Sequence, residues 1–262
     1  MKVVNLRDNF SNYFNSFDLF IILFILLFIV GYLVAAKKHK KKPWPKLRSI
    51  LWVTGFVCIL VSVIGPIAKL SHHLFVFHMI MHLLLGMLAP FFIALSRPIT
   101  LLLTSLKTQH ARRVTRLLRS ATVRLLTHPI SALLLNIGGL WVLYTSTVFN
   151  LIHESTFWLN FVHIHLFFSG YLFTISIIAI EPFSHKFSYL FRSSIMILAL
   201  AGHDILSKFL FSNPLNSFGF SDVQYGAVLM YYGGDFVDLL LITALCYFWY
   251  HSANSNKTRA FI

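Results

Sequence analysis

Two histidines, His78 and His82, are four residues apart in a long apolar stretch at residues 71–98, SHHLFVFHMIMHLLLGMLAPFFIALSRP. Side chains at positions i and i+4 of an α-helix lie one above the other on the same face. In a helix, both imidazoles would therefore face one partner, with Met81 on an adjoining strip as a supporting group. Imidazole and thioether ligands together suit copper, and imidazole alone also suits zinc or iron.

The surroundings of this pair decide how it is interpreted. The spacing alone is a weak indication of a metal site, and the two rings could instead be hydrogen-bonded to neighbouring helices. Within a membrane-spanning helix, however, ionisable side chains are rare and are functional by default. Zinc-protease chemistry is disfavoured, because position 79 of this motif is methionine instead of glutamate. We expect a metal or cofactor site and no enzymatic turnover.

Further candidate ligands occur at other points of the chain. His163 and His165 are two residues apart, so they point to nearly opposite sides of a helix, and only one of them can face the same centre. His203 is a third candidate within an apolar run. Three more histidines could capture an incoming ion at one membrane face or could be ordinary interfacial residues: His72, His73 and His153.

Carboxylates accompany these histidines. Asp204 directly follows His203 and could orient its ring, or it could form an ion pair with Lys208 one turn later. Asp235 and Asp238 are three residues apart and share one helix face. These aspartates could compensate the charge of a bound cation, relay protons or orient imidazoles from other helices.

The composition of the whole chain is that of an integral membrane protein. Of its 262 residues, 57% are hydrophobic and 11% are charged, and the mean hydropathy is +0.75. A soluble domain would carry about 25% charged residues. The two cysteines, Cys58 and Cys246, are too few for a disulfide framework. Residues 1–17 show no small-residue cleavage site, so we predict no removed signal peptide.

Apolar segments of about 20 residues are long enough to span a bilayer core. Seven such segments predict an all-α protein with one transmembrane domain over residues 1–262. The predicted spans are residues 17–36, 49–70, 73–95, 129–152, 157–180, 189–212 and 226–250.

The basic residues predict the orientation. Of the 22 Lys and Arg residues, 18 fall in or beside the connections and the tail on one side of the predicted membrane. Cytoplasmic loops hold such an excess. We therefore expect the N-terminus outside and the C-terminus in the cytoplasm.

The net charge of +14 follows from this distribution and favours anionic lipids at the cytoplasmic face. The connection at residues 100–127 places apolar residues among arginines with rough helical spacing. It is expected to form an amphipathic helix on the cytoplasmic leaflet, with a partner-docking helix as the alternative. We predict no binding of nucleic acid, because no soluble domain carries a basic surface.

The candidate ligands share one depth. At about 1.5 Å per residue, four predicted helices place histidines or aspartates roughly 7–14 Å below the outer boundary. This common layer is the strongest indication of a buried site.

Four motifs occur in order along the chain: HMIMHLLLGMLAPFFIALSRP from His78, THP at residues 127–129, HIHLFFSGYLF from His163 and SDVQYGAVLMYYGGDFVDLLLI from Ser221. They resemble the motifs of the CtaG-like cytochrome c oxidase assembly factors of Bacillus-type and related bacteria. The first is similar to that family's HMxQHxLLxxxAPPLLxLGxP signature, with Met81 and Phe91 replacing a glutamine and a proline.

The resemblance implies a multi-pass protein of the bacterial plasma membrane that is needed to build a haem-copper oxidase of the respiratory chain. Copper would be bound by the histidine layer and passed, as by a chaperone, to a nascent oxidase subunit. Two alternatives stay open. One is a haem-binding redox protein, in which two facing histidines ligate the iron. The other is an ion or copper transporter that uses Asp235 and Asp238.

Overall fold

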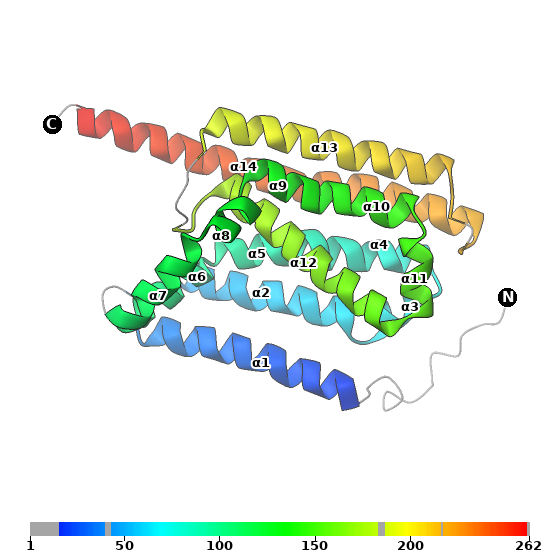
Figure 1. Ribbon diagram of the computed structural model, residues 1–262, viewed down its shortest axis with the longest axis horizontal. Coiled ribbons are helices and arrows are strands. Elements are labelled where there is room, and N and C mark those ends of the chain that lie inside the picture. The colour runs from blue at the N-terminus through cyan, green and yellow to red at the C-terminus, as the bar shows by residue number, and fades with distance from the viewer. Residues whose placement is uncertain (1–15, 40–42, 183–186, 216, 261–262) are drawn as a thin grey trace.

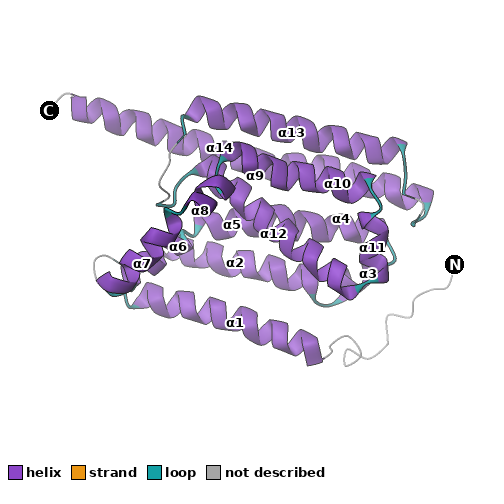
Figure 2. Cartoon of the chain, viewed as in Figure 1, coloured by secondary structure: helices purple, strands orange, loops and turns teal. Residues whose placement is uncertain are grey.

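The structure, a computed structural model, describes residues 16–39, 43–182, 187–215 and 217–260. Throughout this part of the chain the regular elements are helices, and no strand is present. Figure 2 shows most of these helices running side by side along one direction, with short connections. The predicted all-α fold is confirmed.

The first half of the chain contains α1 Ser16–Lys37, α2 Lys46–Val63, α3 Pro66–Leu70, α4 Phe75–Leu83, the π-helix η2 Leu84–Leu88, α5 Ala89–Leu95, α6 Pro98–Ser105, α7 Thr108–Leu118 and α8 Ala121–Leu126. The second half contains α9 Pro129–Leu133, the π-helix η3 Leu134–Gly138, α10 Gly139–Thr145, α11 Val148–Glu154, α12 Thr156–Ile178, α13 Tyr189–Ser212 and α14 Phe220–Ala260.

Six helical stretches of the described chain are long and apolar enough to cross a membrane. They are Asp18–Lys37, Lys46–Val63, Phe75–Leu95, Thr156–Ile178, Tyr189–Ser212 and Phe220–Asn254. A shorter apolar helix, Pro129–Thr145, runs through α9, η3 and α10. At 1.5 Å per residue it is about 25 Å long, less than the roughly 30 Å of a bilayer core. Six of the seven predicted spans thus have a long helical counterpart.

The prediction of one span over residues 129–152 is wrong, because the helix ends at Thr145 and the chain turns. The hydroxyl groups of Thr145 and Ser146 each donate a hydrogen bond to a carbonyl one turn earlier. Ser146 itself has extended backbone. After the turn, α11 directs Phe149 and Ile152 into the core, where both are buried. The apolar character of these residues therefore reflects core packing and not continuation of the span.

Two further boundaries differ from the prediction. The span predicted over residues 49–70 ends at Val63, because Gly65 adopts a left-handed φ of 88° and Pro66 then begins α3. The amphipathic segment at residues 100–127 forms three short helices, α6, α7 and α8, instead of one. A local cap starts the last of these, since the Ser120 hydroxyl accepts a hydrogen bond from the backbone N–H of Val123.

The helices form a bundle in which α1 packs on α2 at one edge and α13 packs on α14 at the other (Figure 1). Helices α4, α5 and α12 lie between these pairs. At one end of the bundle α1 ends, α2 begins and α6–α8 gather. We call this the basic end, because the connections there hold most of the Lys and Arg residues. The opposite end, with α3 and α11, is called the α11 end.

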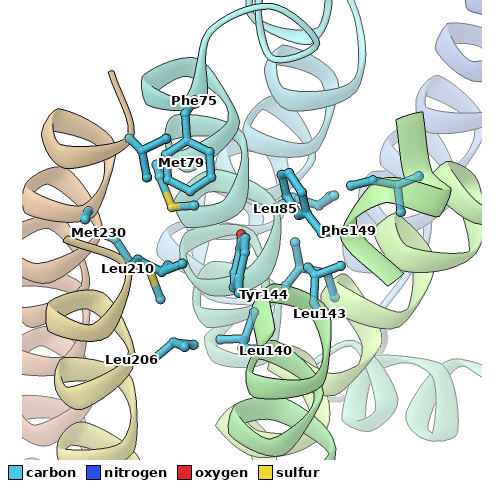
Figure 3. Close-up of a cluster of buried hydrophobic side chains, with 14 residues drawn as sticks. Phe75, Met79, Leu85, Leu140, Leu143, Tyr144, Phe149, Leu206, Leu210 and Met230 are labelled. Atoms are coloured by element: carbon cyan, nitrogen blue, oxygen red, sulfur yellow. The ribbon is translucent and has the colours of Figure 1, made fainter. Parts of the chain in front are cut away.

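A cluster of buried side chains fills the bundle toward the α11 end (Figure 3). It joins Phe75 and Met79 of α4 to Tyr144 of α10, Phe149 of α11 and Leu210 of α13. Burying such side chains contributes about 1.5–3 kcal/mol each in a water-soluble protein. In a bilayer, packing and hydrogen bonds between helices carry more of the stability.

The π-helix η2 lets α5 and α12 approach closely. Pro90 has no N–H group to donate to the Gly86 carbonyl, and its ring would collide with that carbonyl in a regular α-helix. The widened turn at Leu84–Leu88 accommodates the proline. The Gly86 carbonyl instead lies against Gly170 of α12, where any Cβ would occupy the same space. Position 170 therefore requires glycine, whereas a side chain at position 86 would press on the side chain of Leu166.

Candidate functional site

His82 of α4 and His203 of α13 face each other inside the bundle. Their ring centroids are 6.1 Å apart, and the ring planes differ by 12°. Each side chain is 1% exposed, and all four ring nitrogens lack a hydrogen-bond partner among the described residues. Buried polar atoms are nearly always hydrogen-bonded, because an unpaired one costs about 1–3 kcal/mol. Four unpaired nitrogens at one point are the feature expected of a ligand site.

Helix α14 holds both histidine-bearing helices in position. The carboxylate of Asp222 accepts hydrogen bonds from the backbone N–H groups of Phe75 and Val76, which open α4. A carboxylate is favourable there, because the first N–H groups of a helix have no partner within it. Further along α14, Gly234 leaves the space that the imidazole of His203 fills, since a Cβ at this position would collide with the ring.

A small cavity of about 30 Å³ adjoins both rings. Besides the histidines, its polar lining is Asn136 of η3, Thr174 of α12 and Asp238 of α14. Met87 of η2 is the thioether of the lining. A cavity of this size holds about one water molecule or one ion.

Of the three predicted aspartates, Asp238 lies at the cavity of the histidine pair. Asp238 is 6% exposed and lines the cavity. The carboxyl groups of Asp204 and Asp235 interact electrostatically with each other. Lys208, the partner predicted for Asp204, lies with its Nζ 5.0 Å from the centre of the Tyr231 ring.

His78 lies one turn before His82 and has a different partner. Its Nε2 is 3.1 Å from the hydroxyl oxygen of Tyr144, which projects from α10 into the buried cluster (Figure 3). The His78 ring also meets the edge of Phe149, with centroids 5.4 Å apart. His78 therefore belongs to the aromatic core, whereas His82 lines the cavity.

The two histidines of α12 diverge, as their spacing predicted. The Nε2 atom of His165 lies 3.1 Å from the carbonyl oxygen of Leu135 in η3, so the ring donates a hydrogen bond to the backbone. His163 interacts electrostatically with His72, and its Nε2 is buried without a hydrogen-bond partner in the described chain. The cavity lining includes neither His163 nor His165.

The remaining predicted residues lie away from the cavity. His72 and His73 are exposed in the turn before α4. His153 belongs to α11, but its side chain is outside the described part of the structure. Met81, the methionine that we predicted beside the histidines, is 2% exposed and does not line the cavity. Met87 lines the cavity instead.

Of the five candidate histidine ligands, only His82 and His203 line the cavity. Within the described ranges, no group of three or more His, Cys, Asp or Glu side chains is arranged to hold a metal ion. Metal binding by this chain therefore stays a prediction. The structure reduces the candidate ligands at the cavity to the imidazoles of His82 and His203.

The separation of the two rings leaves room for one small ion. Metal–imidazole bonds are about 2 Å long, and the ring centroids are 6.1 Å apart. Zinc takes four ligands in structural sites, more than this pair offers. Copper accepts imidazole ligands and, as Cu(I), soft thioether ligands, so the Met87 sulfur is also compatible with copper.

A second polar cluster, which the sequence did not reveal as a site, lies at the basic end. Glu181 is 2% exposed. Its carboxylate accepts hydrogen bonds from the backbone N–H groups of Ile99 and Thr100, at 3.0 and 2.9 Å, and from the Thr100 hydroxyl at 2.6 Å. Burial raises the pKa of Glu181, although these hydrogen bonds and the nearby Arg97 act to lower it.

Arg192 completes this cluster. It lies in the first turn of α13 and is 3% exposed. Its Nη1 donates to the carbonyl oxygens of Ile177 and Ile178 at 2.6 and 3.0 Å. These carbonyls end α12 and have no partner within the helix. The cluster thereby ties α6, α12 and α13 together.

Sequence reasoning missed several residues of functional interest. Asn136 could have been found, because an amide inside an apolar run is unusual. Tyr144, Asp222 and Glu181 could not, because their hydrogen bonds join residues 66 to 147 positions apart. No local pattern predicts such pairs.

This chain is similar in sequence to several known proteins. Curated relatives are uncharacterized proteins of Mycobacterium leprae (strain TN), 28% identical over 61% of this chain, and of Mycobacterium bovis and Mycobacterium tuberculosis, each 28% identical over 64%. The chain spans about a quarter of the length of these relatives, with 25% of the first and 27% of the others covered. No solved structure matches.

The family described as cytochrome c oxidase caa3 assembly factor (Caa3_CtaG) matches residues 26–252, which include all the residues that line the cavity. The resemblance drawn from the four motifs is thereby confirmed: this chain belongs to the cytochrome c oxidase caa3 assembly factor family.

Proposed function

We propose that this protein is a membrane assembly factor that binds copper between His82 and His203 and delivers it to a nascent haem-copper oxidase subunit. One observation carries the proposal: two buried imidazoles face each other with all four ring nitrogens unpaired. Copper is the cargo of this protein, so no enzymatic turnover is required.

The surroundings of the pair support a cationic ligand. A buried charge is costly unless it is compensated nearby. Asp238 lines the same cavity and is electrostatically coupled to Asp204 and Asp235. In this proposal the carboxylates offset the charge of the ion and do not bind it directly.

The cavity size favours an ion over haem. A porphyrin ring is far larger than a space of about 30 Å³, which holds about one water molecule. A haem between His82 and His203 would require the helices to separate.

We also propose the orientation predicted from charge. The basic end would lie in the cytoplasm of a bacterial cell, with α7 against anionic lipids, and the helix Pro129–Thr145 would serve as a short seventh span. His82 would then lie roughly 10 Å below the outer boundary, since α4 begins at Phe75. This depth is compatible with capture of copper from the outer side.

Elemental analysis of the purified protein tests copper binding. The protein would be isolated in detergent, loaded with Cu(I) and compared with the variants His82→Ala and His203→Ala. We expect near-stoichiometric copper in the native protein and its loss in both variants, with no haem absorption band.

Two control variants distinguish loss of the cavity ligands from the general effect of removing a buried histidine. His78→Ala and His165→Ala remove histidines that bond to Tyr144 and Leu135 and do not line the cavity, so both should retain copper. Copper that is retained in His82→Ala, or a haem band in the native protein, would refute the proposed site.

A further inference from the structure

An open groove lies on the side of the bundle between the helix Pro129–Thr145 and α12. It has a volume of about 480 Å³, and we call it the lateral groove. Most of its lining is apolar, including Leu134, Val142 and Phe161, which are 64%, 57% and 52% exposed. Gly138 also lines the groove and leaves open space, because a Cβ added at this position would have no other atom within 4 Å.

Asn136 connects this groove with the histidine cavity. It lines both spaces, as does Leu140 one turn later. The side-chain amide of Asn136 forms no hydrogen bond with any described residue. The lateral groove and the cavity that His82 and His203 line therefore share residues of η3 and α10.

We propose that the lateral groove receives a transmembrane helix of a partner protein, which hydrogen-bonds to Asn136 and so reaches the edge of the histidine cavity. This inference rests on the proposed function, because the partner would be the oxidase subunit that takes the copper. Delivery would then occur sideways within the membrane, through the η3 segment, and not through either aqueous end of the bundle.

The polar atoms of the groove decide between a helix and a lipid chain. An unpaired amide within a bilayer has no water to bond and is costly. An acyl chain offers neither donor nor acceptor, so it would leave Asn136 unpaired. A partner helix can supply a polar side chain, and asparagine and small residues such as Gly138 are typical of contacts between transmembrane helices.

Site-specific photo-crosslinking tests this surface in cells that assemble the oxidase. A photoreactive phenylalanine analogue, p-benzoylphenylalanine, would replace Val142 in the groove or, as a control, Leu198 on α13. The two side chains are 57% and 58% exposed, and Leu198 lies outside the groove lining. We expect an adduct from position 142, mapped by mass spectrometry to a transmembrane segment of an oxidase subunit, and none from position 198.

A second variant links the adduct to the amide. Asn136→Leu should lower the crosslinking yield about tenfold, the value of one hydrogen bond between transmembrane helices. The purified protein with the crosslinker at position 142 should still bind copper, because Val142 does not line the histidine cavity. Adducts with lipid only, adducts with a second copy of this chain, or equal yields at both positions would overturn the docking surface. Copper analysis of the same samples separates that failure from a failure of copper binding itself.

Discussion

The imidazole rings of His82 and His203 lie nearly parallel, at 12°, with their centroids 6.1 Å apart and their nitrogens unpaired. This arrangement is unfavourable for the ligand-free protein, because both rings lose their hydrogen bonds to water on burial. His78 provides the contrast, since its ring is buried to a similar degree but bonds to Tyr144. The difference separates a histidine that supports the fold from a pair available to a ligand.

Replacing either unpaired histidine with leucine should stabilise the metal-free protein. His82→Leu and His203→Leu each remove two unpaired buried nitrogens and keep most of the side-chain volume. We expect the free energy of unfolding to rise by about 1 kcal/mol. Thermal unfolding in detergent with a copper chelator measures this change. A marked decrease would mean that the rings make stabilising contacts in the native protein.

His78→Phe should have the opposite effect. The substitution leaves the buried hydroxyl of Tyr144 without its partner, at a cost of about 1–3 kcal/mol. Adding Tyr144→Phe removes the unpaired hydroxyl and should restore part of the lost stability. Unfolding of the two single variants and the double variant measures the coupling. Simple additivity of the two substitutions would contradict the hydrogen bond.

Gly234→Ala should disturb the histidine pair without touching a ligand. The added methyl group collides with the His203 ring, so the ring or α14 must move. We expect a loss of about 1–3 kcal/mol in stability and weaker copper binding. Gly31→Ala in α1 is the control, because the added Cβ would have no other atom within 4 Å and alanine favours a helix. Normal copper binding by Gly234→Ala would show that the ring position is not critical.

Glu181 should make stability depend on pH. Burial raises the pKa of Glu181 above its ordinary value of 4.5, so the folded state holds the proton more tightly than the unfolded chain. The contribution of this group to stability therefore falls as the pH rises from about 4.5 through the raised pKa.

Glu181→Gln removes this titration. The unfolding temperature of the native protein should decline relative to the variant as the pH rises through that range. Thermal scans from pH 4.5 to 8 test this, with the exposed Glu154→Gln as the control. Parallel curves for native protein and Glu181→Gln would exclude the effect.

Much of the architecture could be predicted from the sequence. Apolar runs of bilayer length identified the membrane-spanning helices, since hydropathy over about 20 residues is a local property. Helical rise predicted one layer of histidines and aspartates. Of that layer, His82, His203 and Asp238 line one cavity. The boundaries at Val63 and Thr145 were missed, because apolar residues that pack inside the bundle look like residues that face lipid.

The sequence by itself determined the all-helical class with apolar helices of bilayer length and, through its motifs, the family. Only the tertiary structure decided that His82 meets His203 while His78 meets Tyr144 and His165 meets the Leu135 carbonyl. The physical reason is rotation: the depth of a side chain follows from its place along one helix, whereas its direction follows from how that helix is turned against its neighbours. Contacts distant in sequence, such as Asp222 with α4 and Gly234 with His203, fix those rotations.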